Sequence, residues 1–329
     1  MCLNLLSCVS TRRNGSATLL GIILGVSMLL GCASNSEEVE MVSTPVSDWQ
    51  RRGETFLYEG RSVFTIDEGE GFPVIILHGY PGSSWDFHKV WPAITEHNRA
   101  IAPDFLGYGL SDKPQDYSYS VADHAAMVTE LATSKGIKEV KLVAHDVGVL
   151  VALELIIKAP ESGLKIESVA LLNGTLFSSE RHPKFIQRLL GGPLGGLVNR
   201  AASERTFTTN LLAISGEAGE DLRPTFKTQW QLLNHPYNAR LMHKLLHTVR
   251  DRRENELRWA DALCTSDVPL TFIVGGADPT SGTRMPESLS DYCRKSFSVS
   301  VLADVGHFPQ LEAPQQTSEA LREWWNGGY

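Results

Sequence analysis

Three residues with versatile acid–base chemistry each follow a predicted strand. They are Asp146, Asp278 and His307, in that order along the chain. The carboxyl ends of the strands in an open α/β sheet meet at one edge, so these side chains are predicted to lie close together. A nucleophile, then an acid, then a histidine is an order in which the acid orients the histidine and the histidine acts as base. The sequence therefore predicts a catalytic triad.

The residues around Asp146 predict a tight strand-to-helix turn. Ala144 and Gly148 flank it, and small residues are needed where a strand and a helix backbone pass very close. The backbone N–H of Val147, at the start of the following helix, is a candidate to stabilise an oxyanion. His145 is predicted to point away from Asp146, because side chains alternate along a strand, and so to be structural.

A carboxylate in this turn, where many enzymes place a serine, favours one kind of reaction. Attack on an ester carbonyl would give an anhydride, whereas displacement at a saturated carbon gives a stable alkyl ester. Water activated by His307 then attacks the carboxyl carbon of Asp146. Asp278 orients His307 and supports its imidazolium form.

The elements that position these residues alternate between strand and helix. This rhythm predicts an α/β fold with a mostly parallel sheet covered by helices on both faces. The predicted strands are 56–58, 62–67, 74–77, 99–104, 140–144, 166–172, 269–274 and 296–302. The predicted helices of this part are 84–97, 120–135, 147–159 (ended by Pro160) and 315–325.

No strand is predicted between residues 174 and 266, which lie between the sixth strand and the next. Helices are predicted there at 183–190, 223–233, 239–249 and 254–264. A helical insertion between two strands of a sheet implies a cap. The predicted domains are thus a core, 51–173 and 267–329, and a cap, 174–266.

Composition and charge exclude several classes of protein. The 329 residues are 42% hydrophobic and 21% charged, which is ordinary for a globular chain and excludes a disordered, collagen-like or coiled-coil protein. The net charge is −8, with no basic block, so no nucleic-acid partner is predicted. His235, His243 and His247 have no carboxylate cluster nearby, and neither a metal nor a cofactor is predicted.

The N-terminus reads as an export signal. Arg12 and Arg13 precede an uncharged apolar stretch, 17–30, which is shorter than the roughly 20 residues of a membrane span but typical of a signal peptide. It ends in Leu-Leu-Gly-Cys, which resembles the lipobox of bacterial lipoproteins, and a plain signal anchor with a chance cysteine is the alternative.

The lipobox resemblance implies removal of residues 1–31 and acylation of Cys32. Residues 32–50, which are polar, are predicted to form a flexible tether to the membrane. Several acyl chains anchor a protein stably. Ala33 fits the pattern of lipoproteins sorted to the outer membrane, so the body of the protein is predicted to face the periplasm.

Cys264 and Cys293 are the two remaining cysteines of the predicted mature body. An exported pair could form a disulfide. Nothing in the sequence brings them within bridging distance, however, so two small buried thiols are the favoured prediction.

Two further runs join the triad in a resemblance to a known family. Residues 78–81 read His-Gly-Tyr-Pro, and residues 104–114 read Asp-Phe-Leu-Gly-Tyr-Gly-Leu-Ser-Asp-Lys-Pro. Over about residues 50–329 the chain resembles α/β-hydrolases of the aspartate-nucleophile branch, which holds epoxide hydrolases and haloalkane dehalogenases. Within it, the chain is most similar to the epoxide-hydrolase-like mesoderm-specific transcript group. The resemblance implies the α/β-hydrolase fold and a second oxyanion donor, the backbone N–H of Tyr80.

The resemblance leaves open whether the leaving group is a halide or the oxygen of an epoxide. Dehalogenases of the family usually place tryptophan directly after the nucleophile and often asparagine in the His-Gly-x-Pro run, where this chain has Val147 and Tyr80. Epoxide hydrolases use cap tyrosines, commonly two, to donate hydrogen bonds to the epoxide oxygen. The cap here holds one, Tyr237, which is alternatively an ordinary amphipathic residue, and the pocket-lining Tyr80 is a possible substitute.

Three hypotheses follow from the sequence. The favoured one is an epoxide-hydrolase-like enzyme with a small apolar substrate, for which the cap residue Trp230 is a candidate contact unless it packs the cap against the core. A haloalkane dehalogenase or another α/β-hydrolase activity is the first alternative. A non-catalytic lipoprotein that binds an apolar ligand in the same pocket is the second.

Overall fold

The computed structural model describes residues 44–180, 190–235 and 240–327. The predicted signal peptide, the lipidation site Cys32, most of the predicted tether and the cap residue Tyr237 lie outside these ranges. Within them, none of the helices combines the length and the apolar composition that crossing a bilayer requires.

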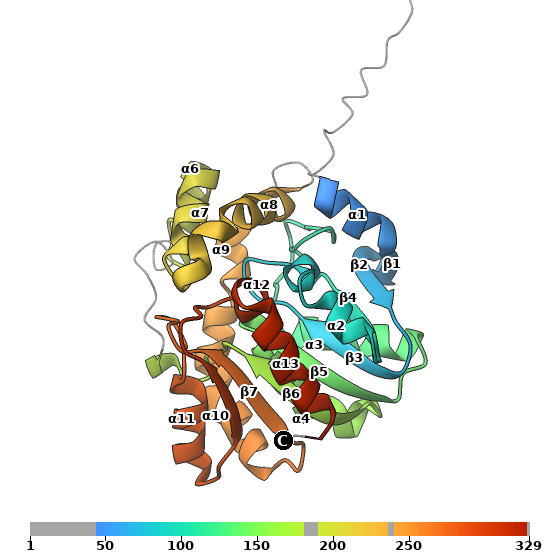
Figure 1. The fold of residues 1–329 in the computed structure, drawn as a ribbon. Helices are drawn as coiled ribbons and strands as arrows, with labels where there is room; N and C mark the ends of the chain where they lie inside the picture. Colours follow the sequence, from blue (N-terminus) through green and yellow to red (C-terminus); the bar gives the residue numbers. More distant parts are fainter. Residues whose placement is uncertain (1–43, 181–189, 236–239, 328–329) are drawn as a thin grey trace, which may run out of the picture. The chain divides into compact units, whose positions relative to one another are not determined.

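An eight-stranded sheet forms the centre of the molecule (Figure 1), in the order β1-β2-β4-β3-β5-β6-β7-β8. β1 pairs with β2 and β2 with β4 in antiparallel fashion, and all other pairs are parallel. The prediction of a mostly parallel sheet is therefore confirmed. The strands are β1 (Glu54–Tyr58), β2 (Arg61–Glu68), β3 (Phe72–Leu77), β4 (Asn98–Pro103), β5 (Glu139–His145), β6 (Lys165–Leu172), β7 (Leu270–Gly275) and β8 (Ser298–Leu302).

The position of β3 explains where a site can form. β3 pairs with β4 on one side and with β5 on the other. The connection after β3 therefore leads to one side of it, and the connection after β4 crosses back to the other side. In doubly wound sheets such a reversal opens a crevice at the carboxyl ends of the two strands. The loops after β3 and β5 carry Tyr80 and Asp146, which therefore face the same crevice.

Helices cover both faces of the sheet, as predicted (Figure 1). One face carries α3 (Val121–Ser134) and α4 (Val147–Ser162), and the other carries α2 (Trp91–Thr95) and α13 (Pro314–Trp325). Each face of the sheet packs against its helices in a hydrophobic core of its own, and alternate residues of β3 point into the two cores. Ile75 and Leu77 pack in one core, and Val74 and Ile76 pack in the other. Burying each such side chain stabilises the fold by about 1.5–3 kcal/mol, which accounts for the unbroken apolar run.

The C-terminal part of the predicted tether 32–50 is not a flexible segment but a packed helix. Residues Thr44–Arg52 form helix α1, and its Val46 and Trp49 are buried in the core beneath α2. The Trp49 ring lies 5.0 Å from that of Trp91 in an edge-on arrangement, and its Nε1 donates to Ser84 Oγ at 3.1 Å. Two apolar residues three positions apart make one face of a helix, a short pattern that the polar surroundings conceal.

Two helix predictions need correction at prolines. Helix α4 continues past Pro160 to Ser162, and Gly163 ends it in the left-handed conformation, with φ 72°. Pro160 removes only the hydrogen bond that its own N–H would donate, and its φ suits a helix, so the last residues of α4 remain helical. The predicted helix 84–97 is instead a 3₁₀ turn, η1 (Ser84–Phe87), followed by α2, whose first turn contains Pro92.

The described part of the insertion between β6 and β7 is largely helical, as predicted, but its helices differ in detail. Apart from Leu190, the predicted helix 183–190 lies outside the described residues. Two of them, α6 (Gly195–Ala201) and α7 (Glu204–Leu212), are not predicted, although Ser203 caps α7 by accepting from the N–H of Thr206. The remaining elements are η2 (Ser178–Glu180), η3 (Glu217–Leu222), α8 (Arg223–Asn234), α9 (Met242–Leu245) and α10 (Thr248–Thr265).

Helix α10 belongs with the core by its contacts. It lies against α4, and its Trp259 is buried there, with Nε1 donating to Glu154 Oε2 at 2.9 Å. The two helices predicted at 239–249 and 254–264 thus merge over Thr248–Thr265, and α9 is a separate short turn. Helix α10 returns the chain from the insertion to β7.

The prediction of two free thiols is wrong, because Cys264 and Cys293 form a disulfide with their Cα atoms 5.0 Å apart. Cys264 lies near the end of α10, and Cys293 ends α11 (Arg284–Cys293). The chain between them passes through β7 and returns, which places the two helix ends side by side. A sequence separation of 29 residues gives no hint of that distance.

Candidate active site

Asp146 occupies the sharp turn between β5 and α4. Its backbone has φ 48° and ψ −108°, a region that non-glycine residues rarely adopt and that marks strain at functional sites. The turn depends on close approach of its neighbours. A Cβ on Gly148 would lie 2.2 Å from the carbonyl oxygen of Leu77, and one on Gly79 would lie 2.6 Å from Cβ of Asp146. This close packing keeps Asp146 in its strained conformation, at the carboxyl edge of the sheet.

The structure brings Asp146, Asp278 and His307 together. His307 Nδ1 lies 2.7 Å from Asp278 Oδ2, and His307 Nε2 lies 3.5 Å from Asp146 Oδ2. A proton on Nδ1 therefore bonds to Asp278, and Nε2 faces Asp146. The Asp146 side chain is 20% exposed, whereas the other two side chains are almost wholly buried, so the carboxylate of Asp146 is the member that a ligand can reach.

The two oxygens of the Asp146 carboxylate have different surroundings. Oδ1 accepts a hydrogen bond from the backbone N–H of Tyr80 at 2.9 Å, whereas Oδ2 faces His307. Tyr80 was predicted to donate to an oxyanion, and its N–H lies within reach of the atom that would carry that charge. Val147, the other predicted donor, is the first residue of α4.

Electrostatics keeps the carboxylates ionised. Burial alone would raise the pKa of Asp146, but the hydrogen bond and charge of His307, with smaller effects of His145 and the Tyr80 N–H, lower it below its ordinary value. The pKa of Asp278 is lowered in the same way: burial opposes the charge, but His307 outweighs it. For His307, burial opposes the charge, but the two carboxylates outweigh it and raise its pKa to about 10.

Asn173 positions Asp278 and is a residue that the triad prediction leaves out. It follows β6, and its Nδ2 donates to Asp278 Oδ2 at 2.8 Å while its Oδ1 accepts from the N–H of Gly275 at 2.7 Å. Thr280 and Ser281 donate their hydroxyls to the same carboxylate. The signal for Asn173 is its place at the carboxyl end of a parallel strand, next to the strand that carries Asp278.

Two buried histidines of the predicted motifs are structural. His78 accepts from the N–H of Phe105 at 2.9 Å through Nε2, and its Nδ1 lies 3.0 Å from the carbonyl oxygen of Gly79. His145 Nε2 lies 2.8 Å from the carbonyl oxygen of His307, which supports the loop of the catalytic histidine candidate. Burial lowers the pKa of both, so each remains a neutral brace.

Glu312 fastens the loop of His307 to the insertion. Its carboxylate accepts from the N–H groups of Gly216, Gly306 and Phe308, at 2.7, 2.8 and 2.9 Å respectively. The N–H of His307 itself donates to the carbonyl oxygen of Ile214 at 2.9 Å. Residues 214–216 connect α7 to η3, so core and insertion are joined beside the triad.

Two adjoining cavities lie above the sheet edge. The smaller, of about 60 Å³, is lined by Asp146, His307 and Val147, with Arg252 and three threonines in its wall. The larger, of about 190 Å³, is lined mainly by apolar side chains of the insertion. Tyr80, Pro81, Leu211 and Ile214 line both cavities, so they form the passage from one to the other.

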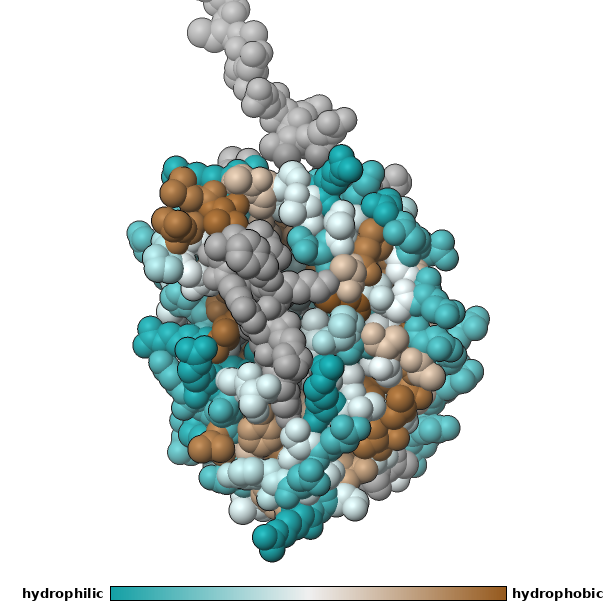
Figure 2. Space-filling view, turned by 90° about the vertical axis from the view of Figure 1, so that its left-hand side faces the viewer, coloured by the Kyte–Doolittle hydropathy of each residue, from teal (hydrophilic) through white to brown (hydrophobic). Residues whose placement is uncertain are grey.

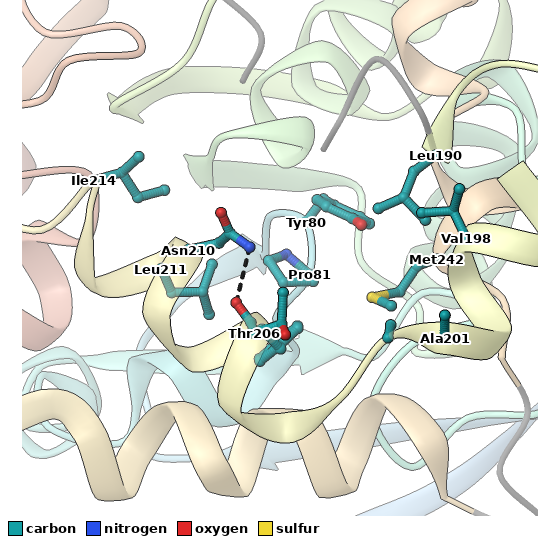
Figure 3. A pocket seen from close by; sticks show the side chains of 12 residues that line it. Tyr80, Pro81, Leu190, Val198, Ala201, Thr206, Asn210, Leu211, Ile214 and Met242 are labelled. Atoms are coloured by element: carbon teal, nitrogen blue, oxygen red, sulfur yellow. Dashed lines mark hydrogen bonds between the residues drawn. The ribbon is translucent and has the colours of Figure 1, made fainter. Parts of the chain in front are cut away.

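The larger cavity lies between the core loop after β3 and the helices of the insertion. Figure 3 shows Leu190, Val198 and Met242 on one side of Tyr80, and Leu211 and Ile214 on the other. Thr206 and Asn210 bring the polar groups, and Asn210 Nδ2 donates to the carbonyl oxygen of Thr206 at 2.8 Å. The cavity therefore fits an apolar chain.

Trp230 does not line either cavity in the part of the chain that the structure describes. Its ring lies 5.3 Å from that of Phe207, which does line the larger cavity, and Arg240 lies over its other side. Helix α8 turns Trp230 toward α7, so any influence on a ligand passes through Phe207.

The outer surface of the insertion is partly apolar. In Figure 2 hydrophobic side chains gather near the top of the molecule, at the level of α6. Leu194 and Leu197 are 63% and 65% exposed there. Helix α6 thus presents apolar side chains outward as well as inward, where Val198 and Ala201 line the larger cavity.

Comparison with known proteins agrees with this architecture. Residues 73–314 match the family described as the alpha/beta hydrolase fold. The mesoderm-specific transcript protein of Mus musculus is 34% identical over 289 residues, covering 83% of this chain and 85% of the relative. A protein of Mycobacterium tuberculosis named as the hydrolase LipZ is 32% identical over 283 residues, covering 85% of this chain and 98% of the relative.

A solved structure supports the fold. The epoxide hydrolase CorEH superposes with a TM-score of 0.67 at 19% identity, covering 83% of this chain and 98% of that one. At that identity the likeness concerns the arrangement of the strands and helices alone.

Proposed function

This chain belongs to the α/β-hydrolase fold family, and from that premise we propose that it is an epoxide-hydrolase-like enzyme that forms a covalent alkyl ester on Asp146. One observation carries the proposal. The strained turn after β5 presents a carboxylate whose Oδ2 faces His307 Nε2 at 3.5 Å, while its Oδ1 is held by the N–H of Tyr80. A carboxylate so placed suits displacement at a saturated carbon.

In the first step Oδ2 of Asp146 attacks a ring carbon of the epoxide. The new bond joins that carbon to Oδ2, and the bond from the same carbon to the epoxide oxygen breaks, leaving its electron pair on that oxygen. The phenol of Tyr80, which lines both cavities, donates its proton to the developing alkoxide. Tyr237, outside the described residues, stays a predicted second donor.

Formation of the ester changes the acidity of His307. The carboxylate charge of Asp146 helps to raise the pKa of His307 in the free enzyme, and esterification removes that charge. The imidazolium therefore releases its proton, which restores the Tyr80 phenol. His307 is then neutral, as a general base must be, and Asp278 holds it in the required orientation.

In the second step His307 takes a proton from water as its oxygen attacks the carboxyl carbon of Asp146. Negative charge develops on Oδ1, which the N–H of Tyr80 already contacts at 2.9 Å. Collapse breaks the bond between the carboxyl carbon and Oδ2, and the diol leaves with Oδ2 and the acid proton. The new carboxylate holds one oxygen from water, and His307 again carries a proton.

Trapping the ester tests the mechanism. His307→Gln blocks only the second step, so incubation with an epoxide is expected to add the mass of one epoxide to the protein, on the peptide that contains Asp146. His97→Gln, the same change at an exposed histidine away from the cavities, is the matched control and should turn over normally. Normal turnover by His307→Gln would overturn the assignment.

Isotope labelling gives an independent measurement. A single turnover in ¹⁸O-water should place the label in the Asp146 carboxylate rather than in the diol, because water attacks the enzyme. Label found only in the product would indicate direct attack by water. No turnover and no label with epoxides, haloalkanes and esters would favour the apolar-ligand-binding protein.

Halide release is the weaker alternative. The described residues that line the smaller cavity include no tryptophan, and Val147 and Tyr80 stand where dehalogenases of this branch commonly have ring and amide donors. A panel of matched epoxides and chloroalkanes with the same carbon skeleton separates the two reactions. Faster turnover of the chloroalkanes would favour a dehalogenase.

We also propose that the enzyme is anchored to the bacterial envelope by acylated Cys32, with its catalytic body in the periplasm. The support is the run Leu-Leu-Gly-Cys after an uncharged stretch. The wild type should partition into the membrane fraction, and Cys32→Ala should escape processing and acylation. If both proteins partition equally into the membrane fraction and both resist processing by signal peptidase, the stretch 17–30 is a plain signal anchor.

A further inference from the structure

Helix α6 leaves a group of apolar side chains in contact with solvent. Leu194, its N-cap residue, and Leu197 are 63% and 65% exposed, and Pro193 beside them is exposed as well. Residues three positions apart lie on the same side of a helix, so the two leucines form one apolar surface. Hydrophobic side chains gather at this height of the molecule in Figure 2. An exposed apolar cluster of this kind indicates contact with a protein or with a membrane.

The charges around this surface are few and positive. Residues 190–203 contain one charged side chain, that of the exposed Arg200, although 21% of the whole chain is charged. Helix α9, which lies against α6, adds Lys244 and no acidic residue. A surface with few charges gives up little hydration when it leaves water, and positive charges at its edge attract anionic lipid headgroups. The composition therefore favours a lipid surface as the partner.

The proposed anchor enters the protein at the same end of the molecule. The chain from Cys32 to Thr44, the first residue of α1, spans at most about 40 Å even when fully extended. Trp49 of α1 and Gln229 of α8 both donate hydrogen bonds to side chains of η1, at 3.1 and 2.7 Å, so α1 and the insertion are neighbours. Both α1 and α6 lie near the top in Figure 1. A bilayer that holds Cys32 is therefore close to the end of the molecule that carries α6.

We propose that the outer face of α6 lies in the surface of the bilayer to which the enzyme is anchored, with Leu194 and Leu197 among the acyl chains and Arg200 at the lipid phosphates. The inference rests on the proposed anchoring by Cys32. The acyl chains of Cys32 hold the protein at the membrane, and the leucines of α6 fix which side of the body faces it. A flexible tether alone would leave the body free to rotate.

This orientation turns the larger cavity toward the lipid. Val198 and Ala201 of α6 line that cavity, and so does Thr206 of α7. Ala201 and Thr206 are also exposed, so the cavity reaches the surface beside the proposed contact. An apolar substrate dissolved in the bilayer therefore enters among the side chains shown in Figure 3 without first crossing water.

Quenching by brominated lipid tests the contact directly. The acylated full-length protein is placed in vesicles of phosphatidylethanolamine and phosphatidylglycerol, with or without bromine on the acyl chains. The additional fluorescence of Leu197→Trp over the wild type should fall about twofold in the brominated vesicles, because an interfacial apolar face reaches the acyl chains and bromine quenches only on contact. Leu257→Trp is the matched control at a leucine of α10 that is 58% exposed, and its additional fluorescence should not change.

Turnover tests the consequence for the substrate. Leu197→Asp puts a charge into the proposed contact, while the anchor and the lining of the cavities stay the same. Its rate with a long-tailed epoxide dissolved in the vesicles should fall about 10-fold, and its rate with a short, water-soluble epoxide should stay within about 2-fold of the wild type. Leu257→Asp should leave both rates unchanged. An equal loss with both epoxides would contradict the proposal, and if Leu197→Asp does not fold, the quenching of Leu197→Trp decides.

The quenching needs no turnover, so it separates this inference from the proposed reaction. Absence of quenching in protein whose acylation at Cys32 is verified by mass spectrometry would overturn the contact, and ester trapping in His307→Gln would still report on the reaction. If Cys32 is not acylated, the protein is added to the same vesicles from outside. Quenching there would support the contact without the anchor, and its absence would overturn the contact. Efficient cross-linking of Leu197→Cys to a second copy in the vesicles would assign the surface to a dimer and likewise overturn the proposal.

Discussion

The carboxyl edge of the sheet and the helical insertion above it are built on different principles. At the sheet edge, Asp278 accepts from Asn173, Thr280, Ser281 and His307, so residues from several strand ends fix one carboxylate. The larger cavity is instead lined mainly by apolar residues, most of them on the short helices of the insertion. The difference teaches that, under the proposed function, the sheet edge would fix the reaction, whereas the choice of substrate would be free to vary with the insertion.

The largest expected effect comes from removing the proposed nucleophile, Asp146, at the sheet edge. Asp146→Asn keeps the shape of the side chain, and asparagine tolerates the positive φ of the turn. Turnover of epoxides is expected to fall by roughly 10⁴-fold or more, because no parallel route to the ester exists. Steady-state and single-turnover rates measure it, with circular dichroism to show an unchanged fold. Residual turnover above one hundredth would mean that the sheet edge does not carry the reaction.

A change in the insertion should alter selectivity and leave the reaction intact. Val198→Phe places a larger side chain in the larger cavity, and should lower kcat/KM for long-tailed epoxides about 10-fold, as expected for a few lost apolar contacts. Short-tailed epoxides should react as in the wild type. Leu197→Phe, on the outward side of the same helix, is the control. Equal losses for short and long tails would show that the two regions are not separable.

The smallest effect concerns stability at alkaline pH, to which only the sheet edge should be sensitive. Two carboxylates raise the pKa of His307 from 6.5 to about 10. Its contribution to stability is therefore fully present below pH 6.5 and is lost as the pH rises toward 10. The difference in Tm between the wild type and His307→Gln should shrink by a few degrees over that window. If the difference in Tm between the wild type and His307→Gln did not change with pH, the raised pKa of His307 would be contradicted. Val198→Phe is the control, and its difference in Tm from the wild type should be the same at every pH.

The sheet and the triad could be predicted because their signals are local. A buried strand such as β5 is a short apolar run, and a functional residue at its end is adjacent to it in sequence. The small residues around Asp146 indicate the turn directly, because the close approach of Gly148 to Leu77 leaves no room for a side chain. Strand ends then meet by topology, which places Asp278 and His307 correctly.

The rest could not be predicted because it depends on burial and on distant contacts. Arg252 lies in a run of arginines and acids that reads as an exposed helix, and only packing on α4 decides which of them points inward. The disulfide between Cys264 and Cys293 needs the path of the chain through β7. Helix α6 lacks a capping side chain, so it gives little signal in sequence.

The hydrogen bonds of Glu312 limit how the insertion can move without disturbing the loop of His307. Its carboxylate holds Gly216 of the insertion and Gly306 beside His307 at once, and His307 itself is bonded to Ile214. If the insertion lifted at this point, it would carry His307 with it and separate it from Asp278 and Asp146. In the proposed enzyme, a substrate that leaves these bonds intact would have to reach Asp146 from the part of the larger cavity lined by Val198 and Met242, on the other side of Tyr80 from Ile214 (Figure 3).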